Sequence, residues 1–176
     1  MTEPATPPLN HQRLSSAEAG RLMRLATYAS TGVALVLIAI KLYAWAQSDS
    51  ISLLATLVDS CLDALASLIN LAAVRHALTP ADHEHRFGHG KAEALAGLGQ
   101  AAFITGSAGF LLVEAAQRLI NPTAIGATAL GQLVMVVSMA LTLMLVIFQR
   151  HVIAKTGSTA ISADALHYKS DLLVNA

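Results

Sequence analysis

Residues 51–74 read ISLLATLVDSCLDALASLINLAAV, and this stretch decides the fold. It is long and apolar enough to cross a bilayer as one helix, yet it contains two carboxylates, Asp59 and Asp63, four residues apart. Four residues is just over one helical turn, so both acids project from one face of the helix. Because carboxylates are costly at membrane depth unless they face a cavity, a partner or an ion, this face predicts a functional site.

The composition of the whole chain agrees with a membrane protein. Hydrophobic residues make up 55% of the 176 residues and charged residues only 12%, which leaves several apolar windows of membrane-spanning length. The formal net charge is zero, so there is no global basic field that would indicate nucleic acid as a partner. A single cysteine, Cys61, excludes an internal disulfide framework and a cysteine-rich zinc module.

The chain divides into a polar tail and a series of apolar helices. We expect residues 1–17 to form a disordered cytoplasmic tail and residues 18–176 to form a partial transmembrane domain. Ser15 with Glu18 three residues later is a capping-box pattern that predicts a helix start. Four full spans cover about residues 22–46, 51–74, 94–119 and 129–148, and the third closes at Asn121-Pro122. A basic connection over residues 150–158 then leads to the start of a fifth helix near Ala160. The predicted fold class is an all-α, polytopic membrane helix bundle.

The distribution of positive charge predicts the orientation. If the spans alternate, one side of the membrane holds most of the basic residues, namely Arg13, Arg21, Arg24, Arg75, Arg86, Lys91, Arg150 and Lys155. The other side holds only Arg118, close to a helix end. This bias places the N-terminus and the polar loop after the second span in the cytoplasm of a multi-pass protein of the inner (plasma) membrane.

A second pair at the same spacing, His167 and Asp171, lies in another largely apolar stretch. Together with Asp59 and Asp63 it makes three carboxylates and one imidazole, a ligand set that suits zinc and, less selectively, ferrous iron, cobalt or cadmium. The alternative for the acids is a hydrogen bond between helices or a salt bridge to Lys41 or Lys169. Asp164 lies on nearly the same helix face as His167. It either orients the imidazole ring of His167 or caps the start of the fifth helix.

The loop between the second and third spans is rich in histidine. Asp82, His85 and His89 are spaced so that they could converge on one ion and leave an open position. His76, His83 and Glu84 are spare candidates. The alternative is a solvated basic loop whose histidines only raise its polarity.

At these residues the chain resembles the cation diffusion facilitator family, in its bacterial zinc and ferrous-iron efflux branch. The matching stretches are SLLATLVDSCLD from Ser52 to Asp63, PAD from Pro80 to Asp82 with FGHGK from Phe87 to Lys91, and ADALHYKSD from Ala163 to Asp171. The resemblance covers about residues 20–176, and its motifs are specific in combination.

The resemblance implies a six-helix transporter domain followed by a cytoplasmic metal-binding domain, normally assembled as a homodimer. It also implies that Asp59, Asp63, His167 and Asp171 form a transport site, and that Asp82, His85 and His89 form a second site on the cytoplasmic side. Five residues follow Asp171, too few to cross the rest of a hydrocarbon core about 30 Å thick. We therefore expect the chain to belong to a longer protein that adds the sixth helix and the C-terminal domain.

The function expected from these features is efflux of a divalent cation, zinc first, in exchange for protons. Metal binding needs deprotonated ligands and expels protons, so a proton gradient could drive export. The protein is then not an enzyme. An intramembrane metalloprotease is disfavoured because the sequence does not contain the His-Glu-x-x-His signature of that class. A passive channel is disfavoured because a tight four-ligand site releases ions slowly. The remaining alternative is a truncated, non-transporting membrane fragment that retains metal-binding residues.

Overall fold

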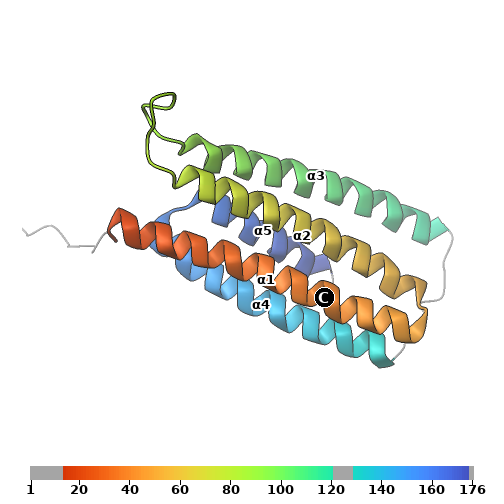
Figure 1. Ribbon diagram of the computed structural model, residues 1–176. Coiled ribbons are helices and arrows are strands. Elements are labelled where there is room, and N and C mark those ends of the chain that lie inside the picture. The colour runs from red at the N-terminus through yellow and green to blue at the C-terminus, as the bar shows by residue number, and fades with distance from the viewer. Residues whose placement is uncertain (1–13, 121–128, 175–176) are drawn as a thin grey trace, which may run out of the picture.

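The computed structural model describes residues 14–120 and 129–174, and these residues form a bundle of α-helices without strands (Figure 1). In chain order the helices are α1 (Ser16–Ser48), α2 (Ile51–Ala77), α3 (Lys91–Ile120), α4 (Ala129–Thr156) and α5 (Thr159–Val174). The first four are long and apolar enough to span a membrane. The predicted all-α, polytopic membrane bundle is confirmed.

The first helix begins where the sequence predicts. The Ser15 hydroxyl accepts the backbone N–H of Glu18 at 3.3 Å, and the Glu18 carboxylate accepts the backbone N–H of Ser15 at 3.0 Å. This reciprocal capping box satisfies two N–H groups that have no partner inside the helix. At the other end Asp49 adopts a left-handed φ of 49°, so the chain turns directly into α2.

The predicted connection over residues 150–158 is wrong. α4 continues to Thr156, and only Gly157 and Ser158 separate it from α5. No glycine or proline occurs between residues 150 and 156, so the basic residues extend the helix beyond its apolar part. Gly157 has a φ of 65°, a conformation that ends helices and that glycine adopts without strain.

Two expectations concern parts of the chain outside the described residues. The predicted disordered tail, residues 1–17, falls mostly before residue 14, where the description begins. The end of the third span was expected at Asn121-Pro122, and residues 121–128 are also outside the described part.

The short helix α5 lies between α3 and α4 and completes the bundle. α1 packs on α2 and α4, α2 packs on α3, and α5 contacts each of the other four helices (Figure 1). A core cluster at the start of α5 joins all five helices; its buried residues are Met23, Ala26, Val74, Ala96, Val152, Ala160 and Ile161. This cluster holds the short helix against its four longer neighbours.

The buried helix faces are built from small and hydroxyl-bearing side chains. On α1 the buried residues recur every three or four positions and include Ala26, Thr27, Ser30, Thr31 and Ala34. On α2 the buried set includes Ser60, Ala64 and Ser67. Lipid tails are as apolar as a leucine side chain, so membrane helices associate by close packing and hydrogen bonds, which small residues permit. Large apolar residues accordingly point outward on every long helix.

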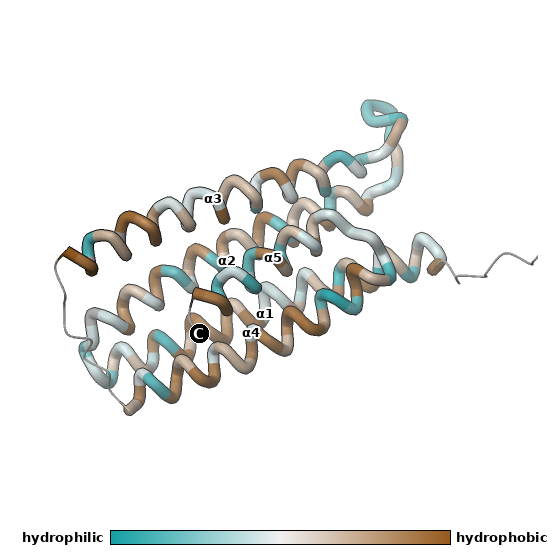
Figure 2. The backbone as a smooth tube through the Cα atoms, turned by 180° about the vertical axis from the view of Figure 1, so that it is seen from behind, coloured by the Kyte–Doolittle hydropathy of each residue, from teal (hydrophilic) through white to brown (hydrophobic). Residues whose placement is uncertain are grey.

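Hydrophilic residues gather at one end of the bundle. The beginning of α1, the loop between α2 and α3, and the connection between α4 and α5 all lie at that end (Figure 1). The loop is a hydrophilic stretch of the tube in Figure 2, whereas the helices carry hydrophobic residues interspersed with less hydrophobic ones. The structure thus brings the basic termini of the spans together at one end, as the alternation of spans requires.

Candidate metal centre

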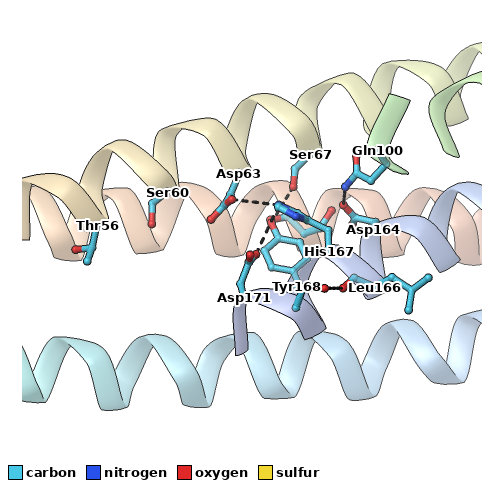
Figure 3. Close-up of polar contacts among 12 residues, drawn as sticks. Thr56, Ser60, Asp63, Ser67, Gln100, Asp164, Leu166, His167, Tyr168 and Asp171 are labelled. Atoms are coloured by element: carbon cyan, nitrogen blue, oxygen red, sulfur yellow. Dashed lines mark hydrogen bonds and ion pairs between the residues drawn. The ribbon is translucent and has the colours of Figure 1, made fainter. Parts of the chain in front are cut away.

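One cluster of potential ligands lies between α2 and α5, in the middle of the bundle (Figure 3). The Nε2 atom of His167 lies 3.1 Å from Asp63 Oδ1 and 3.6 Å from Asp171 Oδ2. Two atoms that ligate zinc tetrahedrally at about 2.0–2.2 Å are about 3.3–3.6 Å apart. The spacing of Asp63, His167 and Asp171 therefore fits one small divalent cation, although residues 63 and 167 are 104 positions apart in sequence.

Asp59 stands outside this cluster. It is exposed on α2, one turn before Asp63, and its carboxylate is not among the atoms that lie within 4.8 Å of one another. The sequence places both acids on one helix face, but a separation of four residues is about 400° of rotation, so the two side chains also differ by about 40° in direction. The structure brings together three of the four predicted ligands.

The imidazole of His167 is held by neighbours on several helices. Its ring makes an edge-to-face contact with Phe103 of α3, at 5.5 Å between ring centroids. The next residue, Tyr168, is almost fully buried, and its hydroxyl lies 2.8 Å from the Ser67 hydroxyl of α2. It also donates to the backbone carbonyl of Ser30 in α1 at 3.4 Å. These contacts fix the rotation of α5 about its axis and so direct His167 toward Asp63.

A small cavity of about 40 Å³ adjoins the cluster. Asp63 and Asp171 form part of its wall, and its polar lining is completed by Lys41, Ser60, Ser138, Thr142 and Tyr168. At about 10–15 Å³ for each water centre, the cavity has room for a few water molecules. Water in this cavity would lie beside the carboxylates of Asp63 and Asp171.

Asp164 has a role that neither sequence alternative described. It is fully buried, and its two oxygens accept hydrogen bonds from the side-chain amides of Gln100 at 3.1 Å and Gln149 at 2.6 Å. These amides come from α3 and α4, so one carboxylate joins three helices. The predicted cap of the fifth helix is instead supplied by Ser158, whose hydroxyl accepts the backbone N–H of Ile161 at 3.2 Å.

The start of α5 is also held by a residue from another helix. Glu93, in the first turn of α3, accepts the Ser158 hydroxyl at 2.6 Å and the backbone N–H of Ala160 at 3.3 Å. A carboxylate at a helix N-terminus satisfies free N–H groups and interacts favourably with the helix dipole. Glu93 therefore connects the beginning of α3 to the helix that carries His167 and Asp171.

A second cluster lies in the loop between α2 and α3. The Nδ1 atom of His85 lies 3.2 Å from Asp82 Oδ1, and the Nε2 atom of His89 lies 3.5 Å from Asp82 Oδ2. The ring of His89 also contacts that of His76, at the end of α2, with 4.5 Å between centroids. The three predicted loop residues are thus brought within the reach of one ion, with His76 beside them.

Asp82 shapes this loop through its side chain. Its Oδ1 atom accepts the backbone N–H groups of Glu84 at 3.0 Å and His85 at 2.6 Å. The hydrogen bond from the His85 backbone holds the pKa of the Asp82 carboxyl below its usual range. Asp82 is therefore a carboxylate at neutral pH, as a metal ligand must be.

Several residues near the α2–α5 cluster were not found from the sequence. Gln100 is an amide in an otherwise apolar span, and this isolation is the signal that could have marked it. Gln149 gives no such signal, because Arg150 and His151 follow it directly. Lys41 interrupts the first span in the same way as Gln100 interrupts the third, and the sequence marked it only as a possible salt-bridge partner of the acids. Glu93 gives no such signal, because an acid in the first turn of a helix is expected at any exposed helix start.

Comparison with known proteins agrees with this arrangement. A family model described as the cation efflux transmembrane domain matches residues 27–176. The chain belongs to the cation efflux transmembrane domain family. Its relatives include a protein named cation-efflux pump FieF from Shewanella oneidensis, 54% identical over 154 residues, which are 88% of this chain and 52% of the relative. The protein of the same name from Pectobacterium carotovorum is 52% identical over 155 residues, with the same two shares.

The matches extend over most of this chain but over only part of each relative. This member of the cation efflux family spans about half the length of the curated relatives it matches. A further protein named cation-efflux pump FieF, from Salmonella arizonae, is 51% identical over 156 residues and is likewise covered to 52%. The family assignment therefore applies to the helix bundle described above.

Proposed function

We propose that this chain provides the membrane part of a transporter that exports a divalent metal cation, zinc first, in exchange for protons. The cluster of Asp63, His167 and Asp171 carries the proposal, because its spacing suits a zinc-sized ion and it adjoins a polar cavity. Asp59 is the fourth ligand in this proposal, since it lies one helical turn from Asp63 and a modest shift of α2 would bring it closer. The names of the curated relatives support export of a cation.

The chain's own residues suggest how metal and protons exchange. When no metal is bound, the cluster takes up protons, which neutralises part of its negative charge and reduces the repulsion between its acids. A divalent cation requires these ligands in their deprotonated form, so its entry from the cytoplasm releases protons. Protons that arrive from the opposite side through the polar cavity would displace the metal outward. Alternate exposure of the site by movement between helices is general among secondary transporters.

The loop cluster has a different place in the proposal. Asp82, His85 and His89 lie in the hydrophilic loop and share no ligand with the α2–α5 cluster. We assign them a second ion, zinc or a similar cation such as iron, cadmium or cobalt. This ion would be bound on the cytoplasmic side of the inner membrane, where the positive-inside bias places the loop.

A homodimer completes the proposed assembly. α3 packs mainly on α2 and α5, and its large apolar side chains, such as Leu98, Phe110 and Leu112, are exposed. In a bilayer this face meets either lipid or a second copy. Chemical crosslinking of the protein in native membranes would show whether α3 lies beside another α3.

The test is metal flux into vesicles that contain the protein, with a zinc dye and a pH dye inside. An imposed proton gradient should drive zinc movement in one direction and proton movement in the other. Asp63→Ala should abolish both signals, because it removes a negative ligand from a site for a doubly charged ion. Cys61→Ala, exposed on the same helix, is the matched control and should leave them unchanged. Zinc flux that does not depend on the proton gradient would contradict antiport. Full activity of Asp63→Ala would contradict the proposed transport site.

A further inference from the structure

A lysine is buried close to the candidate transport site. The ammonium group of Lys41, on α1, donates a hydrogen bond of 2.7 Å to the Ser60 hydroxyl and one of 3.1 Å to the backbone carbonyl of Thr56. Both acceptors belong to α2, and Ser60 is itself buried and lies one turn before the Asp63 position (Figure 3). The positive charge is thus held in one place by partners that carry no net charge.

The same lysine lines the cavity that adjoins the metal cluster. Lys41 and Ser60 share this wall with Asp63 and Asp171, two of the three clustered ligands. A buried ammonium is unfavourable at membrane depth unless opposite charge lies nearby. Here the negative charge that remains on the cluster across the cavity supplies that opposite charge, so the lysine and the cluster stabilise one another when no metal is present.

A fixed cation beside a cation site has a direct consequence for binding. When a divalent metal enters, it neutralises the carboxylates and is repelled by the ammonium across the small cavity. The lysine therefore favours the empty site and opposes the loaded one. Such opposition suits a transporter, because an ion must be bound firmly enough to enter and weakly enough to leave.

We propose that Lys41 is a built-in counter-cation of the transport cavity, which lowers the affinity for the transported divalent cation and so speeds its release. The inference rests on the proposed function, since it takes the Asp63, His167 and Asp171 cluster as the site of the transported ion. The competing explanation is that Lys41 only joins α1 to α2 through its two hydrogen bonds. The two explanations predict opposite changes in metal affinity when the charge is removed.

The first measurement is zinc and cadmium affinity of the purified protein, by calorimetry and by competition with a chelator. Lys41→Met keeps the length of the side chain but not its charge, and we expect at least a tenfold tighter affinity. Lys41→Arg keeps the charge and should stay near the original affinity. Lys169→Met is the matched control: it removes the same charge two residues from Asp171, but from an exposed side chain. It should leave the affinity unchanged.

Transport kinetics give a second readout. In vesicles Lys41→Met should lower both KM and the maximal rate, because the metal binds more tightly and leaves more slowly. A rise in KM, or an affinity equal to that of Lys169→Met, would overturn the proposal and leave Lys41 as a structural link. If the unaltered protein neither binds nor moves metal at this site, the proposed function fails, and that result is separate from any effect of Lys41.

Ser60→Ala tests the proposal in a variant that retains the lysine. Loss of the hydroxyl removes the acceptor that holds the ammonium 2.7 Å from α2, so the charge can move toward Asp63 and Asp171. We expect several-fold weaker metal binding, the opposite of the Lys41→Met effect. This measurement decides the matter even if Lys41→Met does not fold. An unchanged metal affinity in Ser60→Ala would then contradict the proposed role of Lys41 as a counter-cation.

Discussion

Among single residues, His167 is the one nitrogen donor in the α2–α5 cluster. Its Nε2 atom faces both Asp63 and Asp171, and its ring is fixed by Phe103, so the donor atom has little freedom to turn away. Imidazole favours zinc and similar transition metals, whereas a set made only of carboxylates favours harder ions. The proposed metal preference therefore depends on this side chain.

His167→Asp should keep metal binding but shift preference from zinc toward manganese, because the set then contains only oxygen ligands. We expect the ratio of zinc to manganese affinity to fall at least about tenfold, equivalent to ~1.4 kcal/mol. Competition binding and vesicle uptake with both ions would measure it. His151→Asp, which makes the same exchange at an exposed position on α4, serves as the control. Unchanged preference in His167→Asp would remove His167 from the ligand set.

In the loop, Asp82 combines a structural and a ligand role, and one substitution separates them. The oxygen of an asparagine can still accept the backbone N–H groups of Glu84 and His85, so Asp82→Asn should preserve the turn while removing the negative charge. We expect at least about a tenfold loss of metal affinity at the loop, ~1.4 kcal/mol, with zinc binding at the α2–α5 cluster retained. Calorimetric stoichiometry would measure this. Glu84→Gln should retain both ions, and equal losses in the two variants would contradict a specific loop site.

Among the elements, α5 is the shortest helix and the one that carries two of the clustered ligands. Its position is set from three sides: Glu93 holds its first turn, Asp164 bonds to α3 and α4, and Tyr168 bonds to α1 and α2. Gly97 of α3 faces the start of α5, where a Cβ would make an ordinary contact at 3.7 Å from the Thr159 carbonyl oxygen. The ligands are therefore placed by polar contacts that α5 makes with all its neighbours.

Glu93→Ala should loosen the beginning of α5, because the Ser158 hydroxyl and the Ala160 N–H both lose their acceptor. Hydrogen bonds to a charged group contribute about 1.5–3 kcal/mol each where they are shielded from water, so a loss of about 1–3 kcal/mol is expected here. Hydrogen exchange at Ala160 should become faster and the melting temperature should fall. Glu84→Ala, an exposed acid in the loop, should change neither. Unaltered exchange at Ala160 would show that the cap does not hold the helix.

For the whole molecule, the proposed orientation follows from the segregation of charge to one end of the bundle. The loop and the beginning of α1 lie at that end, and the turn between α1 and α2 lies at the other (Figure 1). The large apolar residues on the outside of the long helices suit lipid between these ends. The two ends should therefore be accessible from opposite sides of the membrane.

Cysteine labelling tests this orientation in a Cys61→Ala background. Gln47→Cys, at the end of α1, should react with an impermeant maleimide in spheroplasts, because the proposed orientation places it outside. His83→Cys, in the loop, should react only in inverted vesicles. Both positions are exposed, so differences in labelling report the side of the membrane and not burial. The reverse pattern would place the N-terminus outside and contradict the proposed direction of transport.

Local sequence patterns predict the helices and group many of the candidate ligands. Apolar windows gave the four spans, Ser15 and Glu18 gave the first cap, and spacings of three or four residues grouped Asp82, His85 and His89 and paired His167 with Asp171. These features are local, because a helix repeats every 3.6 residues and a short window contains the whole pattern.

Which side chains from different helices meet depends on how the helices pack. It set Asp59 apart from Asp63, placed Asp164 between Gln100 and Gln149, and turned Lys41 toward the wall of the cavity. Each outcome depends on how far every helix is rotated and which neighbour it packs against. In a membrane bundle that rotation is set by small residues and buried polar contacts between helices, and local periodicity carries no information about them.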